Sequence, residues 1–450
     1  MIKRLYQNQL EKVGIGFWSL NPNKASKIFF YLLLLFLPTQ LGRHFWPDSS
    51  FVFGLRLDYL SPTLYLTDVF IILIFICSFV DVFRSLKKIN KTYLYVFVLF
   101  SLSLVVGIAT SRNLIAGYYG LVKFLEFSFL SYYVFANLKN LNKQIIFLCF
   151  FSGLVFESLL SFLQYLNQGS VGSLFYFFGE RAYTAQTPGI ANASINGQMA
   201  LRPYATFSHP NVLAGYLVSA MLYLLIFYTK GKFKKIFIYT GILLGTLSLF
   251  ITLSRVAIIL WAFYLFILFG VLMYEKYKKE IYNLKIAGTL AVIAITILIG
   301  LMSFKNTLFL QRFISTNLSD ESIAQREELI KQSSGMFLQN PVFGVGVNNF
   351  YNNETYLTTS QGAFILQPVH NIFLLVLAET GAIGFTLFIF VLAKTAINTF
   401  KTKSYKKKYL LMILFSIIFL GNFDHYFFTL QQGQVLLALF IGIANSYKNI

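Results

Sequence analysis

Residues 93–136 read YLYVFVLFSLSLVVGIAT, then SRN, then LIAGYYGLVKFLEFSFLSYYVFA. The first run contains no charged residue, and the second contains only Lys123 and Glu126. A helix needs about 20 mostly apolar residues to cross the hydrocarbon core of a bilayer. Two such runs separated only by Ser111, Arg112 and Asn113 therefore predict a pair of antiparallel transmembrane helices joined by a tight turn.

The same pattern recurs along the whole chain. Of its 450 residues, 57% are hydrophobic and 12% are charged, whereas a soluble domain has about 25% charged residues. This composition excludes a soluble enzyme, a disordered protein and a fibrous protein. We predict an all-α integral membrane protein, forming one polytopic domain over residues 1–450. Windows of spanning length give twelve transmembrane helices, at 28–42, 63–83, 93–110, 114–136, 144–166, 209–229, 236–253, 256–273, 284–303, 370–393, 409–422 and 430–446.

The basic residues predict the orientation of these spans. With both termini in the cytoplasm, the inner segments hold 26 Lys and Arg residues and the outer segments hold 10. An excess of Lys and Arg in cytoplasmic loops is typical of membrane proteins. We therefore predict a multi-pass protein of the cytoplasmic membrane, with its active site outside. The net charge of +20 is then an anchor on membrane lipid and a topology signal, and it does not indicate nucleic-acid binding.

Arginine and lysine divide between the two sides. Eight of the ten arginines fall in predicted outer segments. Arginine binds phosphate or carboxylate through two parallel N–H groups, which lysine cannot do. The distribution indicates an outer surface that handles phosphate. For any single arginine, the alternative is an ordinary ion pair with a carboxylate in an ordered loop.

Two of the predicted outer loops are long, at 167–208 and 304–369. Loops of this length without structure of their own are uncommon unless they are functional. Within the second, residues 322–339 predict an amphipathic helix lying on the membrane surface. Ser322 is its expected N-cap, and its expected apolar face is Ile323, Leu329, Ile330, Met336 and Phe337.

The candidate reactive groups gather in outer segments. The chain has four histidines: His44, His209, His370 and His425. Histidine titrates nearest neutral pH and suits proton transfer, so these are candidate bases. His209 has the alternative role of a helix cap before Pro210, and His44 beside Trp46 that of an interfacial anchor.

Other polar residues have competing interpretations. Asp424 next to His425 is an acid–base pair by sequence, although adjacent helical residues do not face each other. Glu379 lies inside a predicted span, where an acid is a functional candidate. Lys123 and Glu126, three residues apart, are expected to neutralise each other. The outer loops contain no Asp-x-Asp or His-x-x-x-His pattern, and Cys77 and Cys149 lie in apolar runs, so we predict no metal and no cofactor.

Several motifs resemble a known family. Residues 202–211 read RPYATFSHPN, and 252–255 read TLSR. Residues 340–350 read NPVFGVGVNNF, and His370-Asn371 is followed after nine residues by Gly381-x-x-Gly384. Over about 200–395 this pattern resembles the O-antigen ligase and polymerase superfamily of membrane glycosyltransferases. One departure concerns the ligase subtype: its motif usually continues to Gly, Thr or Tyr, where this chain has Leu387.

The resemblance implies an enzyme with a GT-C-like helical bundle. It would transfer a glycan from a polyprenyl pyrophosphate carrier to the hydroxyl of an acceptor glycan, lipid or protein, with inversion and without a metal. By resemblance, Arg202 and Arg255 hold the pyrophosphate and His370 acts on the acceptor hydroxyl. Possible supporting residues are His209, Asn211, Arg326, Asn371, Glu379, Asp424 and His425.

Elementary chemistry agrees with this assignment. Negative charge develops on the leaving pyrophosphate, and fixed arginines in a dry groove stabilise it. A transporter or flippase for lipid-linked sugars is the alternative, because twelve spans with both ends inside is also a transporter plan. Two halves of similar sequence, with polar residues near the bilayer midplane, would favour a transporter. We detect no similarity between 28–230 and 236–446, and the polar candidates lie in the outer loops, so the enzyme is favoured.

Overall fold

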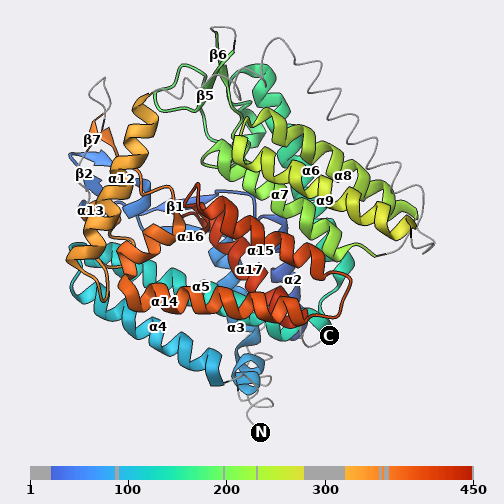
Figure 1. Ribbon diagram of the computed structural model, residues 1–450, viewed down its shortest axis with the longest axis horizontal. Helices are drawn as coiled ribbons and strands as arrows, with labels where there is room; N and C mark the ends of the chain where they lie inside the picture. The colour runs from blue at the N-terminus through green and yellow to red at the C-terminus, as the bar shows by residue number, and fades with distance from the viewer. Residues whose placement is uncertain are drawn as a thin grey trace, which may run out of the picture.

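The computed structural model describes residues 22–86, 91–195, 198–229, 232–277, 320–353, 357–358 and 364–447. Long helices make up most of this part of the chain (Figure 1). They are α2 (Pro22–Leu35), α3 (Leu66–Leu86), α4 (Lys91–Ala109), α5 (Leu114–Asn137), α6 (Lys143–Asn167), α7 (Pro210–Phe227), α8 (Lys232–Ile251), α9 (Arg255–Tyr277), α12 (Asp320–Gln339), α14 (Ile372–Lys401), α15 (Lys407–Gly421) and α17 (Gln431–Tyr447).

The helices confirm a mostly helical membrane protein, but they do not confirm twelve spans. Eleven of the predicted spans fall on described helices, and the twelfth, 284–303, lies outside the described residues. In the described part of the chain, six helices are long and apolar enough to cross a membrane: Leu66–Ser85, Lys91–Ala109, Leu114–Asn140, Lys143–Asn167, Pro210–Phe227 and Ile372–Lys401. The 14 residues of α2 and the 15 of α15 fall short of the length that a span needs.

Helix starts follow from capping residues in the sequence. The Asn113 side chain accepts a hydrogen bond from the amide of Ala116, so the predicted turn at 111–113 ends in an N-cap. Asn142 caps α6 and Asn371 caps α14 in the same way. Asparagine is a favoured N-cap because its short side chain satisfies amides that lack a partner within the helix.

The helices pack around α7 and α17. Nearly all of α7 is buried, because it is apolar on every side and neighbouring helices cover it. It packs on α6, α8, α9 and α15, whereas α17 packs on α5, α14 and α15 (Figure 1). The largest apolar cluster lies between these helices.

Short elements join the helices. The all-α prediction overlooked four two-stranded antiparallel sheets in the described residues, because strands this short leave no alternating pattern in the sequence. They are β1 (Gly42–His44) with β4 (Thr63–Tyr65), β2 (Phe51–Val52) with β3 (Leu55–Arg56), β5 (Asn192–Ile195) with β6 (Gln198–Leu201), and β7 (Leu357–Thr358) with β8 (Phe364–Ile365). The short helices are η1 (Asp48–Ser50), η2 (Asp58–Leu60), η3 (Leu138–Asn140), η4 (Ser173–Phe178), α13 (Phe350–Asn353) and α16 (Tyr426–Thr429).

The amphipathic helix of the second long loop is present as α12. It begins at Asp320, so Ser322 is not its N-cap. Leu329 and Met336 are buried as predicted, but Ile330 is 45% exposed. Ser333 donates to the carbonyl oxygen of Leu374 at 3.0 Å. This contact places α12 against the first turn of α14.

The glycine motifs fasten the rest of that loop to α14. The helix is broken at Gly381, whose φ is +63°. The amide of Ala382 donates to Pro341 at 2.8 Å, and the amide of Gly346 donates to the carbonyl of Glu379 at 3.0 Å. A β-carbon on Gly381 would lie 2.4 Å from the carbonyl of Val342. The glycines therefore allow a backbone-to-backbone approach at a kink.

Candidate active site

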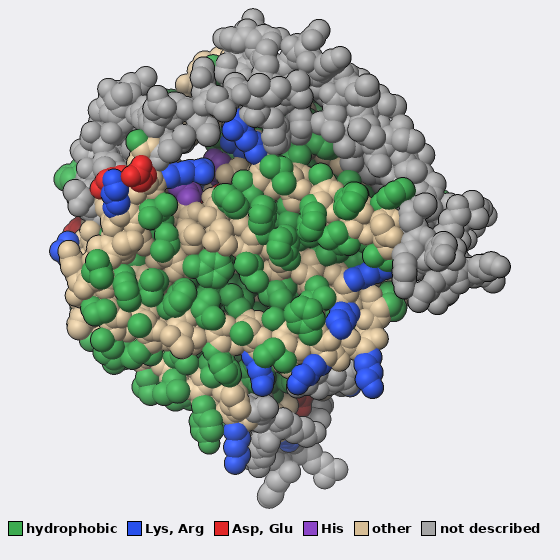
Figure 2. Space-filling model, viewed as in Figure 1, with side chains coloured by type: hydrophobic (Ala, Val, Ile, Leu, Met, Phe, Trp, Pro, Cys, Tyr) green, Lys and Arg blue, Asp and Glu red, His purple; other side chains and the backbone are tan. Residues whose placement is uncertain are grey.

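Four segments that are distant in the sequence meet at one end of the helices. They are 202–211 before α7, 252–255 between α8 and α9, 367–371 before α14, and 422–425 after α15. Figure 2 shows histidine side chains beside Lys and Arg side chains in a recess next to α12. The resemblance and the residue types predicted a site in these segments, and the fold brings them together.

The 202–211 segment is held in place from α6. The side-chain oxygen of Gln164 accepts from the amides of Tyr204 and Ala205, at 3.0 and 2.6 Å. Glu157 accepts from the amide and the hydroxyl of Thr206, at 3.1 and 2.8 Å. Because these groups are buried and fully engaged, the segment has a defined shape before any ligand binds. Gln164 and Glu157 of α6 therefore have structural roles.

Arg202 joins two of the segments. It is 7% exposed, its Nε donates to the carbonyl oxygen of Thr252 at 2.8 Å, and one terminal nitrogen donates to Asn211 Oδ1 at 2.8 Å. The amide group of Asn211 in turn donates to Asp424 Oδ2 at 3.1 Å. A continuous chain of hydrogen bonds thus runs from Arg202 to Asp424.

Asp424 lies beside two histidines. Its Oδ1 is 4.0 Å from Nδ1 of His370 and accepts from the backbone amide of His425 at 2.8 Å. The rings of His370 and His425 have centroids 5.3 Å apart. Asp424 and His425, which are adjacent in the sequence, therefore converge with a histidine more than fifty positions away.

Each histidine of the site has one ring nitrogen engaged by a neighbouring side chain. Nε2 of His370 lies 3.0 Å from Gln367 Oε1, which can only accept, so this nitrogen donates and Nδ1 keeps its lone pair in the neutral ring. Nδ1 of His425 lies 2.7 Å from the Thr429 hydroxyl. Nε2 is therefore the nitrogen of His425 that this contact leaves available.

Burial keeps the histidines neutral. It lowers the pKa of His425 to about 4, with Asp424 opposing the shift. It also lowers the pKa of His370, again against the influence of Asp424, and Arg326 lowers it further. Nδ1 of His370 is buried without a hydrogen-bond partner among the described residues. The site thus contains a neutral imidazole with a free lone pair, which is the form that accepts a proton.

Arg255 follows the turn that Arg202 contacts, and Arg326 lies near His370. Arg255 begins α9, and its Nε–H is buried without a partner in the described part of the chain. A buried guanidinium donor without an acceptor suits an anionic ligand. Arg326 is exposed on α12, near enough to His370 to affect its pKa.

Three predicted site residues have structural roles. The side chain of His209 accepts from the amide of Asn211 at 3.1 Å and caps α7. Burial and the neighbouring Arg202 lower the pKa of His209 to about 3, so it is neutral. Asn371 caps α14, accepting from the amides of Phe373 and Leu374. Glu379 accepts from the amide of Phe350 at 3.2 Å and secures the loop that docks on α14.

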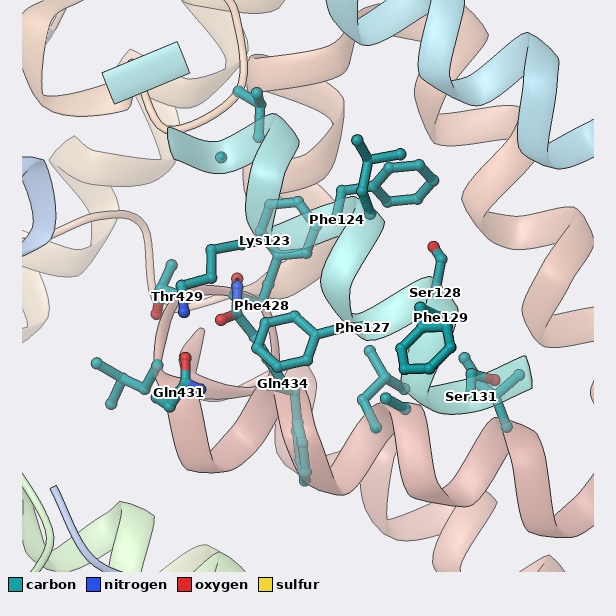
Figure 3. A pocket seen from close by; sticks show the side chains of 18 of the residues that line it. Lys123, Phe124, Phe127, Ser128, Phe129, Ser131, Phe428, Thr429, Gln431 and Gln434 are labelled. Atoms are coloured by element: carbon teal, nitrogen blue, oxygen red, sulfur yellow. Dashed lines mark hydrogen bonds between the residues drawn. The ribbon is translucent and has the colours of Figure 1, made fainter. Parts of the chain in front are cut away.

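A cavity of about 990 Å³ lies between the helices beside the site. Its lining includes Tyr59 and Thr429, which contact His425, and Ser208, which precedes His209. Farther in, phenylalanines of α5 and side chains from residues 428–434 line it (Figure 3). The cavity is therefore polar where it meets the site and mostly apolar between the helices.

A buried ionic group lies within that cavity. Nζ of Lys123 is 2.5 Å from Asp68 and 3.2 Å from Glu126, so the predicted neutralisation is present and extends to a second acid. Gln431 donates to Thr67 at 2.9 Å and to Asp68. Lys123 and Gln431 are both labelled in Figure 3.

Sequence reasoning missed several partners. Gln367 and Thr429 contact ring nitrogens of His370 and His425, and Asp68 pairs with Lys123. The spacing of Gln367 three residues before His370, and of Thr429 four residues after His425, was a usable signal for the first two. The partnership of Asp68 with a helix far along the chain leaves no such signal.

The metal prediction needs a qualification. No metal-ligand pattern is visible in the outer loops, yet one donor atom from each of His370, Asp424 and His425 lies within 4.8 Å of the others. The donors come from two distant segments, so sequence spacing could not reveal the group.

Comparison with known proteins is consistent with this geometry. No curated protein matches the chain significantly. The family model described as O-antigen ligase matches residues 240–389, a third of the chain. This stretch includes Arg255, Arg326 and His370, whereas Arg202 precedes it and Asp424 follows it. The resemblance of this membrane protein to the O-antigen ligase and polymerase superfamily is therefore confirmed over residues 240–389.

Proposed function

We propose that the protein transfers a glycan from a polyprenyl pyrophosphate carrier to an acceptor hydroxyl at the outer face of the cytoplasmic membrane, without a metal. The family match supports O-antigen ligase-like glycan transfer in general. The observation that carries the finer proposal is that His370, Asp424 and Arg202 come together from separate segments. Arg255 follows the turn that Arg202 contacts, and an apolar cavity lies alongside.

The acceptor hydroxyl donates its hydrogen to Nδ1 of His370. Asp424, 4.0 Å away, stabilises the imidazolium that forms, and Gln367 holds the ring through Nε2. The hydroxyl oxygen then attacks the anomeric carbon from the side opposite the carrier. The bond between that carbon and the pyrophosphate oxygen breaks, and the configuration inverts.

The electron pair of the broken bond goes to the pyrophosphate. Arg255 has an unused, buried N–H for this group, and Arg202 contributes positive charge from beside the 252–255 turn. Charge stabilisation by groups already fixed in a water-poor site is a large catalytic effect. The apolar cavity between α5 and α17 suits the carrier's hydrocarbon chain.

Separate measurements of donor binding and turnover test this division of roles. Arg202→Ala and Arg255→Ala should lose both binding of the lipid-linked donor and turnover. His370→Ala should lose about 10²–10⁴-fold in turnover and bind donor almost normally. If His370→Ala abolishes donor binding in a protein of normal fold and abundance, the assignment is wrong.

A transporter or flippase for lipid-linked sugars is the second candidate. The observation in its favour is the ionic group of Lys123, Asp68 and Glu126 inside the cavity. Covalent transfer by purified protein in detergent distinguishes the two, because a transporter makes no new bond. Production of a glycan–acceptor linkage in micelles supports the enzyme, and its absence together with donor flux in proteoliposomes supports the transporter.

A further inference from the structure

We infer that His370, Asp424 and His425 form a binding site for one borderline transition-metal ion such as Zn²⁺, and that the bound ion blocks the site. The inhibitory part rests on the proposed role of His370 as the base, whereas the binding part does not. One ring nitrogen from each histidine and one carboxylate oxygen lie within 4.8 Å of one another, and this grouping supplies the argument.

The donor set is of the kind that Zn²⁺ prefers. Two imidazole nitrogens and a carboxylate, with water in the fourth position, is a recurrent set of zinc ligands. One donor atom from each residue lies within 4.8 Å of the others. Donors of a tetrahedral zinc site are about 3.4 Å apart, given zinc–nitrogen bonds of about 2.1 Å. A closing movement of about 1 Å between the 367–371 and 422–425 turns would therefore complete the site.

The ring orientations are already those of ligands. Nδ1 of His370 carries a lone pair, is buried, and has no hydrogen-bond partner among the described residues. It faces Asp424 Oδ1 at 4.0 Å, and a lone pair facing a carboxylate is unfavourable unless a cation or a hydroxyl hydrogen lies between them. A metal ion satisfies both groups at once.

Neighbouring side chains hold the ligands as outer partners usually do. The Thr429 hydroxyl lies 2.7 Å from Nδ1 of His425, so Nε2 is the nitrogen available to the metal. Gln367 Oε1 accepts from Nε2 of His370 and so leaves Nδ1 for the metal. The Asn211 amide group holds the second oxygen of Asp424. Such partners fix the tautomer and strengthen metal binding.

Hard cations do not suit this set. Mg²⁺ prefers oxygen ligands in octahedral geometry, whereas this group has a single carboxylate whose two oxygens already accept N–H bonds. The site should therefore select Zn²⁺ or Co²⁺ over Mg²⁺. A metal on Nδ1 of His370 occupies the lone pair that the acceptor hydroxyl needs, so binding and turnover compete.

Titration with Co²⁺ tests binding directly, through the visible absorption of tetrahedrally coordinated cobalt. The full-length protein in detergent should take up one equivalent, and Zn²⁺ should displace it. His425→Gln and Asp424→Asn should each weaken binding about 100-fold or more, and Thr429→Val about tenfold. The double variant His44→Asn/His209→Asn removes the other two histidines of the chain and should bind cobalt like the wild type.

Activity supplies the second readout. Zn²⁺ should inhibit glycan transfer with the affinity measured by displacement of cobalt, and EDTA should restore the rate. Absence of the cobalt signal, or a signal that persists in both His425→Gln and Asp424→Asn, overturns the site. Binding without inhibition overturns the competition at His370. Failure of the proposed function is separate, since the zinc-free protein would then transfer no glycan while still binding cobalt.

Discussion

Nε of Arg202 donates to the carbonyl oxygen of Thr252 at 2.8 Å, three residues before Arg255. This contact links two arginines that are about fifty positions apart in the sequence. The Nε–H of Arg202 is therefore occupied by the backbone of the turn that precedes Arg255. In contrast, the Nε–H of Arg255 has no partner among the described residues. Arg202 therefore shapes the turn as well as adding charge, and Arg255 is the more available ligand for an anion.

Arg255→Lys should remain badly impaired although it preserves the charge. Lysine lacks the planar fork that can contact two phosphate oxygens. Loss of a bidentate charged contact from a dry site should cost about 2–4 kcal/mol of transition-state stabilisation. The measurement is kcat/KM with a lipid-linked donor, beside donor affinity.

Arg112→Lys is the matched control for this change. Arg112 lies in another predicted outer segment and donates to the backbone carbonyl of Asn352 at 3.0 Å from an exposed position. Its replacement should change kcat/KM by less than about twofold, as for most exposed substitutions. Equal losses in the two variants, or near wild-type activity of Arg255→Lys, would contradict the role of Arg255.

His209 and His370 should respond differently to the same substitution. His209 caps α7, and asparagine is also a good cap, so His209→Asn should preserve stability and activity while His209→Ala loses about 1 kcal/mol of stability. His370→Asn should lose turnover without loss of stability, because asparagine cannot act as a base. Thermal unfolding and turnover, measured on the same preparations, separate the two roles. A catalytic loss in His209→Asn with unchanged stability would show that capping is not the whole role of His209.

The sequence predicted the helical membrane class and most candidate site residues, since apolar runs and capping asparagines are local signals. It did not predict how distant segments come together to form the site. Asp424 and His370 meet only because α14 and α15 pack together. The kink at Gly381 likewise depends on a loop about forty residues earlier. Such features come from tertiary contacts, and a single sequence has no period or spacing that records them.

Gly381→Ala should destabilise the protein and disturb the site together. The added β-carbon would lie 2.4 Å from backbone atoms of Val342, at a residue whose φ is +63°. Strain and overpacking of this kind cost about 2–4 kcal/mol. Thermal unfolding in detergent measures the loss. Gly270→Ala in α9 is the control, because a β-carbon there meets nothing within 4 Å; equal behaviour of the two variants would show that the docked loop does not need the glycine.

The orientation of the chain stays a prediction from its basic residues. Both termini and the 394–408 segment should face the cytoplasm, and 304–369 should face outward, because the inner segments hold 26 Lys and Arg residues and the outer ones 10. A membrane-impermeant thiol reagent on intact cells should label Asn352→Cys and spare Lys403→Cys. The reverse labelling pattern would reject the orientation and, with it, the placement of the site outside.

Glycan transfer should survive EDTA and should gain nothing from added Mg²⁺. In the proposed reaction Arg202 and Arg255 stabilise the leaving pyrophosphate, so no divalent ion is needed for that charge. Among His370, Asp424 and His425, only Asp424 has a carboxylate. Both of its oxygens already accept N–H bonds, so the three residues offer few oxygen ligands to Mg²⁺ or Mn²⁺. The assay uses protein purified and treated with chelator, with rates compared before and after addition of Mg²⁺ or Mn²⁺. If turnover disappears in EDTA and returns with Mg²⁺ or Mn²⁺, the arginines do not perform the role given to them. If EDTA raises the rate instead, removal of a zinc ion from His370 accounts for the gain.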